Sequence, residues 1–224
     1  ADRHRPRRTV GLRVVRDEAS SATRVYGGVT GEERVAERRR KLIEAGMVLF
    51  GSGGSVQVRV KDIVVEAGLT ERYFYESFSD LGDLFDAVFE DAAEVLESKV
   101  KAAVPKTSED ALAQVSVVLR TTVDTLTADP RMIRIFFVEA LGKGGRPASR
   151  HGHILNRATG HVLQWPSPED RLLLEAPAED QMKAFALSGA ASELLVAWAE
   201  GVLEVTPSEL SDFLVGLYCR TNLP

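Results

Sequence analysis

Apolar residues recur at helical spacing from Glu32 to the end of the chain, and this pattern predicts an all-α fold. The apolar stripes follow the i, i+3, i+4 and i+7 positions of amphipathic helices. Alternation of apolar and polar residues is confined to 56–60, which is too short to predict a strand. We expect about nine helices, over residues 32–50, 60–67, 71–78, 81–104, 108–126, 130–141, 148–165, 176–203 and 208–220.

Several of these helices begin at recognisable capping signals. Asp129 followed by Pro130 supplies an N-cap and a proline in the first helical position. The segment 206–209 combines an N-cap threonine, a proline and an N3 glutamate, and Thr107 with Asp110 fits a capping box. Thr70 is placed to cap the helix over 71–78. These signals give the helix boundaries more precisely than periodicity alone.

Residues 1–30 differ from the rest of the chain. They contain seven arginines, with serine, threonine and glycine between them, and show no sustained helical period. Such a composition predicts a basic, mostly disordered arm. We therefore expect three parts: an arm over 1–30, a small helical head over 31–80, and a larger helical domain over 81–224.

The net charge is misleading as a total. The chain is 44% hydrophobic and 27% charged, as expected of a globular protein, and carries a formal charge of −5. That total argues against a nucleic-acid binder, because DNA attracts positive charge. However, residues 1–80 have a balance of +3 and residues 81–224 a balance of −8. Any contact with nucleic acid is therefore expected in the first 80 residues.

The reactive residue types form no catalytic or metal-binding pattern. Cys219 is the only cysteine, which excludes an internal disulfide and a cysteine-based zinc site, and it is interpreted as a packing residue. His151 and His161 share one helix face but lie ten residues apart, about 15 Å along a helix, so they cannot chelate one ion. We expect no metal and no cofactor. The chain has no secretory segment and no apolar run near 18 residues, which predicts a cytoplasmic protein that does not span a membrane.

The segment 58–78 carries the strongest functional signal, because it reads as a helix-turn-helix. Gly68 between two short helices permits the left-handed conformation that such a turn requires. Phe74 and Phe78 point inward at i and i+4. The outward positions can read base edges and hold phosphates, and they are Arg72, Tyr73 and Ser77, with Tyr75 at the edge.

The run from Lys61 to Thr70, then 74–78 and Asp83-Leu84, resembles the DNA-binding domain of TetR-type transcriptional repressors. The resemblance covers residues 34–90 with specific motifs and extends more weakly to the end through 194–218. It implies a dimeric all-α repressor with a DNA-binding head and a carboxyl-terminal domain that binds a small molecule. It further implies a double-stranded, palindromic DNA operator, from which the small molecule releases the repressor.

The resemblance also assigns roles residue by residue. Tyr75 matches a tyrosine that usually touches phosphate, and Lys61 matches a basic position that meets the DNA backbone. The implied DNA-contacting set is Arg59, Lys61, Thr70, Glu71, Arg72, Tyr73, Tyr75 and Ser77. Two departures lower the expected affinity. The family usually has a Lys-Glu pair after the recognition helix, whereas this chain has Leu81-Gly82 at that place. In addition, Glu76 would place a negative charge near the DNA phosphates.

The arginine arm could offset this loss of positive charge. Arginines on a flexible leader can enter the minor groove, where narrow A·T-rich stretches concentrate negative potential. A solubilising tail is the alternative interpretation of residues 1–30.

The second half of the chain is expected to bind a ligand and to form a homodimer. Residues 176–203 are apolar nearly all round, which predicts a helix that is buried on all sides. With 208–220 it would form a four-helix interface between two copies, through Leu187, Ala191, Leu194, Leu195, Trp198, Leu210, Phe213, Leu214 and Leu217. A pocket for a hydrophobic effector is expected among Phe89, Leu96, Leu119, Phe136, His151, His161, Trp165 and Phe185.

Three functions stay open at this point. The first is a ligand-responsive repressor that is not an enzyme. The second is a DNA-binding regulator without a small-molecule ligand. The third is an all-α enzyme, which would need a nucleophile–base pair or clustered carboxylates. Acidic neighbours such as Glu90-Asp91 point apart on a helix and do not form such a cluster.

Overall fold

The computed structural model describes residues 30–52, 58–105, 111–139 and 177–222, and every regular element in these ranges is helical. This confirms the predicted all-α class. The expected helix over 148–165 lies outside the described residues. The elements are α1 (Gly31–Gly51), α2 (Val60–Glu66), α3 (Glu71–Ser77), α4 (Leu81–Ala103), α5 (Ala111–Ala128), α6 (Pro130–Arg134), the π-helical η1 (Ile135–Glu139), α10 (Ala178–Ala199) and α11 (Pro207–Asn222).

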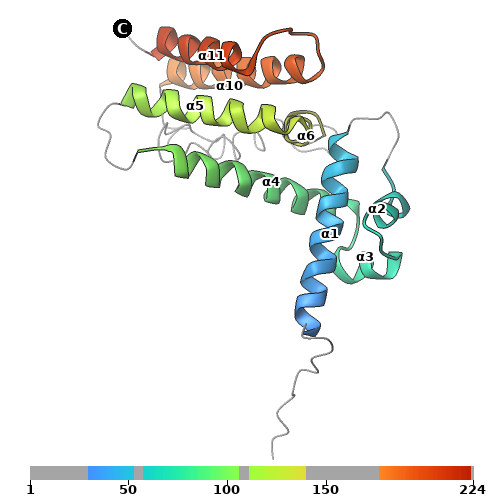
Figure 1. Cartoon of the computed structure of the whole chain (residues 1–224). Helices are drawn as coiled ribbons and strands as arrows, with labels where there is room; N and C mark the ends of the chain where they lie inside the picture. The colour runs from blue at the N-terminus through green and yellow to red at the C-terminus, as the bar shows by residue number, and fades with distance from the viewer. Residues whose placement is uncertain (1–29, 53–57, 106–110, 140–176, 223–224) are drawn as a thin grey trace, which may run out of the picture.

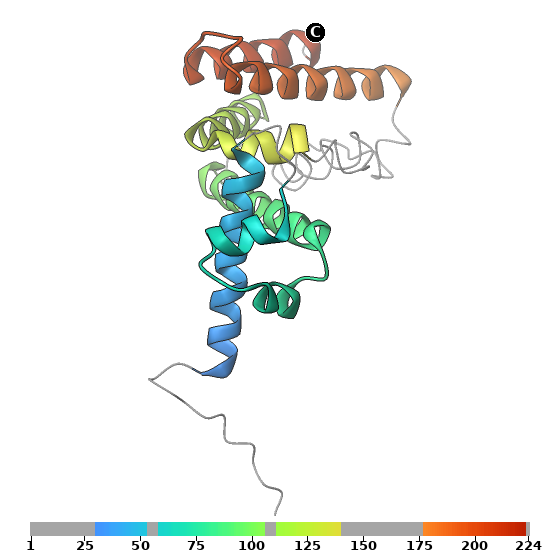
Figure 2. The ribbon, with the colours of Figure 1, turned by 90° about the vertical axis from the view of Figure 1, so that its right-hand side faces the viewer.

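The helices form a small head and a layered body. In the body, α4 lies below α5 and α6, and α10 and α11 lie above them (Figure 1). The long helix α1 descends from the body, and α2 and α3 pack beside it (Figures 1 and 2). Because α1 contacts α2 and α3 as well as α4 and α6, it joins the head to the body.

Two of the predicted capping signals, at Asp129 and at Thr206, act as the sequence predicts. The Asp129 carboxylate accepts a hydrogen bond from the backbone N–H of Arg131 at 3.2 Å, with Pro130 in the first turn of α6. The Thr206 hydroxyl accepts a hydrogen bond from the backbone N–H of Glu209 at 3.2 Å, and the Glu209 carboxylate accepts one from the backbone N–H of Thr206 at 2.8 Å. A further capping box, which the sequence analysis missed, joins Thr30 and Glu33 at the start of α1. The expected box at Thr107 lies outside the described residues.

Aromatic side chains link the head, the body and the π-helical segment. The Phe50 ring of α1 lies edge-on to Phe85 of α4, with 5.4 Å between the ring centroids. Phe89 of α4 contacts Phe136 of η1 in the same way, also at 5.4 Å. All four rings are buried in one continuous core. Burial of such large apolar surfaces is the dominant stabilising contribution to the fold.

Helix α10 ends at Ala199, four residues before the predicted end, because Gly201 adopts a left-handed φ of 71° and terminates it. Within the described residues of one chain, α6, η1 and α11 pack against this helix, and Met182 and Phe185 are 64% and 48% exposed. The predicted burial on all sides includes a second copy of the chain and stays a prediction. No helix in the described ranges has both the length and the apolarity to cross a bilayer.

Candidate nucleic-acid interface

The turn between α2 and α3 sets the angle of the helix-turn-helix. Gly68 has a φ of 64°, and its N–H donates to the carbonyl of Val65 at 3.2 Å. The N–H of Leu69 donates to the carbonyl of Val64 at 2.8 Å. These two bonds form a complete Schellman motif, which requires a left-handed residue at the glycine position. Thr70 occupies the N-cap of α3 as predicted, but its hydroxyl makes no capping hydrogen bond.

Helix α3 has one buried face and one exposed face. Phe74 and Phe78 are buried as predicted, and their ring centroids lie 5.9 Å apart. Tyr75 is 60% exposed, and its ring stands edge-on to Phe74 at 5.3 Å. The packing of Phe74 therefore supports the Tyr75 ring and leaves most of that side chain accessible to a phosphate.

Glu76 connects the exposed face of α3 with α1. The Nε of Arg72 donates to Oε1 of Glu76 at 2.9 Å, and Nη2 of Arg38 lies 3.8 Å from Oε2. The guanidinium of Arg38 also lies over the Tyr73 ring, 4.5 Å from its centroid. Tyr73 is consequently half-buried, which corrects the expectation that it faces fully outward. Stacking by a residue of α1 could not be inferred from the period of α3.

Arg59 and Lys61 bring positive charge to the start of α2. The Asp62 carboxylate accepts from the Nε of Arg59 at 3.3 Å and from its backbone N–H at 3.0 Å. These hydrogen bonds, the side-chain bond first, lower the pKa of Asp62. Asp62 thus caps α2 where the side chain of Arg59 cannot, because arginine has no acceptor. Lys61, the second residue of α2, is exposed.

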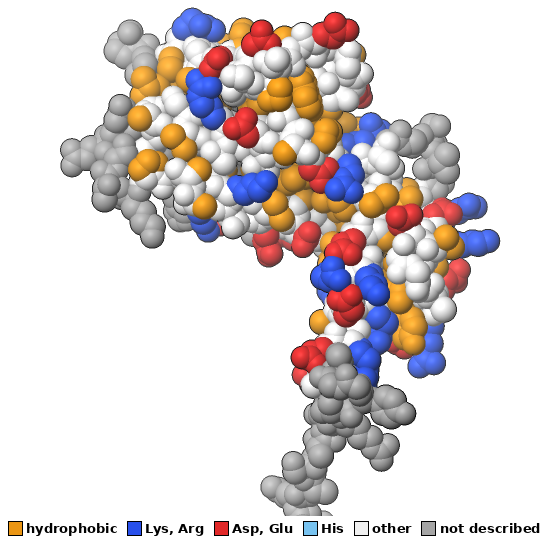
Figure 3. Space-filling model, viewed as in Figure 1, with side chains coloured by type: hydrophobic (Ala, Val, Ile, Leu, Met, Phe, Trp, Pro, Cys, Tyr) orange, Lys and Arg blue, Asp and Glu red, His pale blue; other side chains and the backbone are white. Residues whose placement is uncertain are grey.

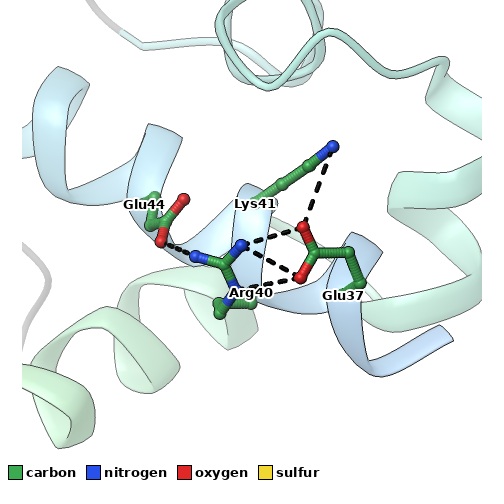
Figure 4. Close-up of polar contacts among 4 residues, drawn as sticks. All are labelled: Glu37, Arg40, Lys41 and Glu44. Carbon is green, nitrogen blue, oxygen red and sulfur yellow. Dashed lines mark hydrogen bonds and ion pairs between the residues drawn. The ribbon is translucent and has the colours of Figure 1, made fainter. Parts of the chain in front are cut away.

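Much of the positive charge on α1 is already compensated (Figure 4). Arg40 lies between two carboxylates, with its Nη2 2.8 Å from Oε1 of Glu37 and its Nη1 bonded to Glu44. Lys41 reaches the same Oε1 of Glu37 at 3.9 Å. The hydrogen bond from Arg40 lowers the pKa of Glu37. Arg40, which faces two carboxylates, is therefore a poorer candidate for DNA contact than Arg59 and Arg72, which each pair with one.

Two arginines of α1 play a part in the head that the sequence did not predict. Arg38 stacks on Tyr73, and Arg39 places its guanidinium 4.4 Å from the Phe78 ring centroid. Successive residues on a helix point about 100° apart, so the basic run 38–41 spreads over different directions. The sequence shows only the basic run 38–41, and the run does not indicate which of its four side chains reach α3.

A groove of about 540 Å³ lies between the head and α4. Arg39, Ile43 and Phe78 line one side together with Ser77, which is half-buried here and does not face fully outward as expected. The α4 side is strongly acidic, with five carboxylates beside Ala87: Asp83, Asp86, Glu90, Asp91 and Glu94. Figure 3 shows acidic side chains along the underside of the body, and Lys and Arg side chains on the outer side of the head. Phosphates are repelled from the acidic groove, so the exposed side of α2 and α3 is the better DNA face.

Solved structures place this arrangement among known folds. FadR, a fatty acid degradation regulator from Bacillus halodurans, matches with a TM-score of 0.62 and 15% identity, covering 80% of this chain and 93% of that one. A TetR-family transcriptional regulator from Streptomyces coelicolor matches with a TM-score of 0.60 and 18% identity, covering 82% of this chain and 81% of that one. A TetR-like regulator from Rhodococcus matches with a TM-score of 0.59 and 17% identity, covering 82% of this chain and 94% of that one.

The chain has the TetR-regulator fold. The fold expected from the resemblance at residues 34–90 is thereby confirmed. No family model matches the sequence, and neither does any curated protein. The TetR-regulator fold of this chain is thus recognised through its three-dimensional arrangement.

In this TetR-regulator fold, the residues expected to bind a ligand do not share one described cavity. Phe89, Leu96 and Phe136 are buried in the core, Leu119 is half-buried on α5, and Phe185 is exposed on α10. The place of Phe185 in a pocket is therefore still a prediction. His151, His161 and Trp165 lie outside the described residues, and the pocket as a whole stays a prediction.

The residues expected at the dimer interface divide into two groups. Leu195, Leu210 and Leu214 are buried in the core of the chain itself, so they have little surface left for a partner. Leu187 is also buried, while Ala191, Leu194, Trp198 and Leu217 are half-buried and Phe213 is 51% exposed.

Among the described residues, no group of three His, Cys, Asp or Glu side chains is placed to hold a metal ion.

Proposed function

We propose that this protein is a dimeric, ligand-responsive transcriptional repressor that binds a palindromic DNA operator through α2 and α3. The observation that carries the proposal is the exposed face of α3. Phe74 and Phe78 anchor this helix, while Arg72 and Tyr75 extend outward. Arginine can bind guanine edges in the major groove, and a tyrosine hydroxyl can bind phosphate.

A second copy of the chain follows from the size of the recognition helix. The seven residues of α3 extend about 10 Å, which is enough for one half-site only. Two such helices one DNA turn apart, about 34 Å, would read a palindrome. Exposed Met182 and Phe185 on α10 and Phe213 on α11 supply apolar surface for dimerisation. We propose that these residues, with half-buried neighbours on both helices, form the contact.

The proposed effector is a hydrophobic molecule bound by the domain over residues 81–224. The hydrophobic class is proposed because the predicted pocket residues are mostly apolar and aromatic. A ligand shifts an equilibrium only if it binds one state more tightly than the other. The effector must therefore prefer a body geometry in which the two heads do not fit adjacent half-sites. Contacts of α1 with α4 and α6 would carry the change to the head.

Selection of bound duplexes from random DNA tests this function directly. Enrichment of a palindrome with half-sites one turn apart is the expected result, followed by footprint release across a metabolite panel. Failure to enrich any sequence would overturn the proposed function. An operator that no metabolite releases would favour a DNA-binding regulator without a small-molecule ligand. A stable monomer at micromolar concentration in sedimentation would overturn the dimer.

A further inference from the structure

We propose that the basic arm of residues 1–30 binds the acidic groove between the head and α4 of its own chain. The groove has a volume of about 540 Å³, and α1 and the end of α3 face α4 across it. Its α4 wall carries five carboxylates, whereas Arg39 is the only basic residue among the described residues of the lining. This excess of negative charge favours a cationic occupant.

The carboxylates of the groove follow one side of α4 and form what we call the α4 stripe: Asp83, Asp86, Glu90, Asp91 and Glu94. The stripe runs for about 16 Å along the helix. Several of its members lie three or four residues apart, and like charges at this spacing destabilise a helix. Asp91 and Glu94 make no hydrogen bond or ion pair within the described part of the chain. A basic segment placed along the stripe would therefore relieve repulsion that α4 itself does not relieve.

The opposite side of the groove shows how an arginine fits there. The Arg39 guanidinium lies 4.4 Å from the centroid of the Phe78 ring, and Ile43 lies beside them in the lining. Arginine stacks on aromatic faces and also binds carboxylates through paired hydrogen bonds. The groove offers both kinds of surface, an apolar side and a carboxylate side, and so suits arginine better than lysine.

The arm has the charge and the reach to occupy the groove. Four of its seven arginines lie within the first eight residues: Arg3, Arg5, Arg7 and Arg8. The arm joins α1 at Gly31, and Arg39 lies about 12 Å further along that helix. The segment 9–30 spans up to about 70 Å when extended. The four arginines can therefore reach every carboxylate of the α4 stripe.

The covalent connection lets several weak contacts act together. A single exposed ion pair contributes little to stability. The four arginines, however, belong to the same chain as the α4 stripe, and such a connection gives an effective concentration on the order of millimolar. Because the contacts are electrostatic and exposed, salt must weaken them.

The contact affects DNA binding if the proposed function holds. An arginine of the arm cannot pair with the α4 stripe and with a DNA phosphate at the same time. DNA must therefore displace the arm from the groove before the arm contributes to binding. The contact lowers the affinity for operator and random duplexes alike, since the same interaction is lost in both complexes.

Trypsin cleavage of the full chain tests the contact without DNA, because trypsin must reach an arginine to cut after it. The test variant combines Asp91→Asn with Glu94→Gln. In low salt, its cleavage after Arg7 and Arg8, followed by mass spectrometry, should be several-fold faster than in the wild type. In about 1 M KCl, where the Debye length is about 3 Å, the two proteins should be cleaved at equal rates.

Glu193→Gln combined with Glu204→Gln is the matched control, because it removes two exposed carboxylates that lie outside the groove. Its arm should be cleaved at the wild-type rate. If the control is accelerated as much as the test variant, the effect is one of net charge and the proposal is overturned. Equal cleavage of the test variant and the wild type in low salt would also overturn it.

DNA affinity separates competition for the arm from direct repulsion of DNA by the α4 stripe. The test variant should bind random duplexes several-fold more tightly than the wild type. This gain should disappear when four arginines of the arm are also replaced: Arg3→Ser, Arg5→Ser, Arg7→Ser and Arg8→Ser. An equal gain with and without these arginines would overturn the competition. If the wild type binds no duplex at all, the proposed function fails, while trypsin cleavage still decides whether the arm binds the groove.

Discussion

Gly51 at the end of α1 lies against the backbone of Arg131 on α6. A Cβ atom at position 51 would stand 2.5 Å from the Cβ of Arg131 and 3.1 Å from its Cα. The two helices therefore meet where α1 has no side chain. Because α1 carries the head and α6 belongs to the body, this contact is one of the points at which the head-bearing helix packs against the body.

Gly51→Ala should destabilise the protein, because the new methyl group meets atoms close to the backbone that cannot move aside cheaply. Overpacking of this kind costs about 1–3 kcal/mol, measured as the free energy of unfolding in urea. Gly31→Ala is the control, since no atom lies within 4 Å of the Cβ position there. Equal stability of the two variants would show that α1 and α6 separate easily.

Lys61 and Arg72 should contribute to DNA binding in different ways. Lys61→Ala should weaken binding to operator and random duplexes alike and reduce the salt slope by about 1, because a lysine that contacts a DNA phosphate does not read the base sequence. Arg72→Ala should cost about 1–3 kcal/mol on the operator and relax the preference at one base pair. Binding measured over a KCl series, with single-base operator variants, separates the two effects. A base-specific loss from Lys61→Ala would reverse these assignments.

Deletion of residues 1–28 tests the arginine arm. If arginines of the arm contact the minor groove or phosphates, the deletion should lower operator affinity and flatten its salt dependence. The measurement is a binding isotherm at several salt concentrations. An unchanged affinity and slope would leave the arm as a solubilising tail.

Phe213→Glu should prevent dimerisation, because it places a charge in the apolar contact proposed between α10 and α11 of two copies. Sedimentation at micromolar concentration should then show a monomer, and operator affinity should fall. Val95→Glu provides the control, since Val95 is similarly exposed but lies on α4. A Phe213→Glu variant that remains dimeric would place the interface elsewhere.

Asp129 should make part of the stability depend on acid pH. Its side-chain hydrogen bond with Arg131 lowers the pKa of Asp129 in the folded state. The carboxylate therefore stabilises the fold above its ordinary pKa of 3.8, and this contribution is lost as pH falls through the lowered value. Asp129→Asn should show a smaller loss of unfolding free energy between pH 7 and pH 3. Arg131→Met should flatten the same curve, because it removes the hydrogen-bond donor.

Features that depend on near neighbours in the chain were predictable. Asp129 with Pro130, and Thr206 with Glu209, begin helices because the capping groups lie within three residues of the N–H groups that they satisfy. The inward position of Phe74 and Phe78 follows from their spacing of four residues. The contact between Arg72 and Glu76 has the same spacing and could have been predicted from it.

The sequence by itself determined the all-α class, most helix starts and the helix-turn-helix with outward Arg72 and Tyr75, because these depend on short-range hydrogen bonds and on the 3.6-residue period. Only the tertiary structure decided that Arg38 stacks on Tyr73, that Phe185 and Phe213 remain exposed, and that Leu210 and Leu214 belong to the chain's own core. Periodicity shows which residues share a helix face. The angle and distance between helices decide what that face meets, and these arise from packing among residues far apart in the chain.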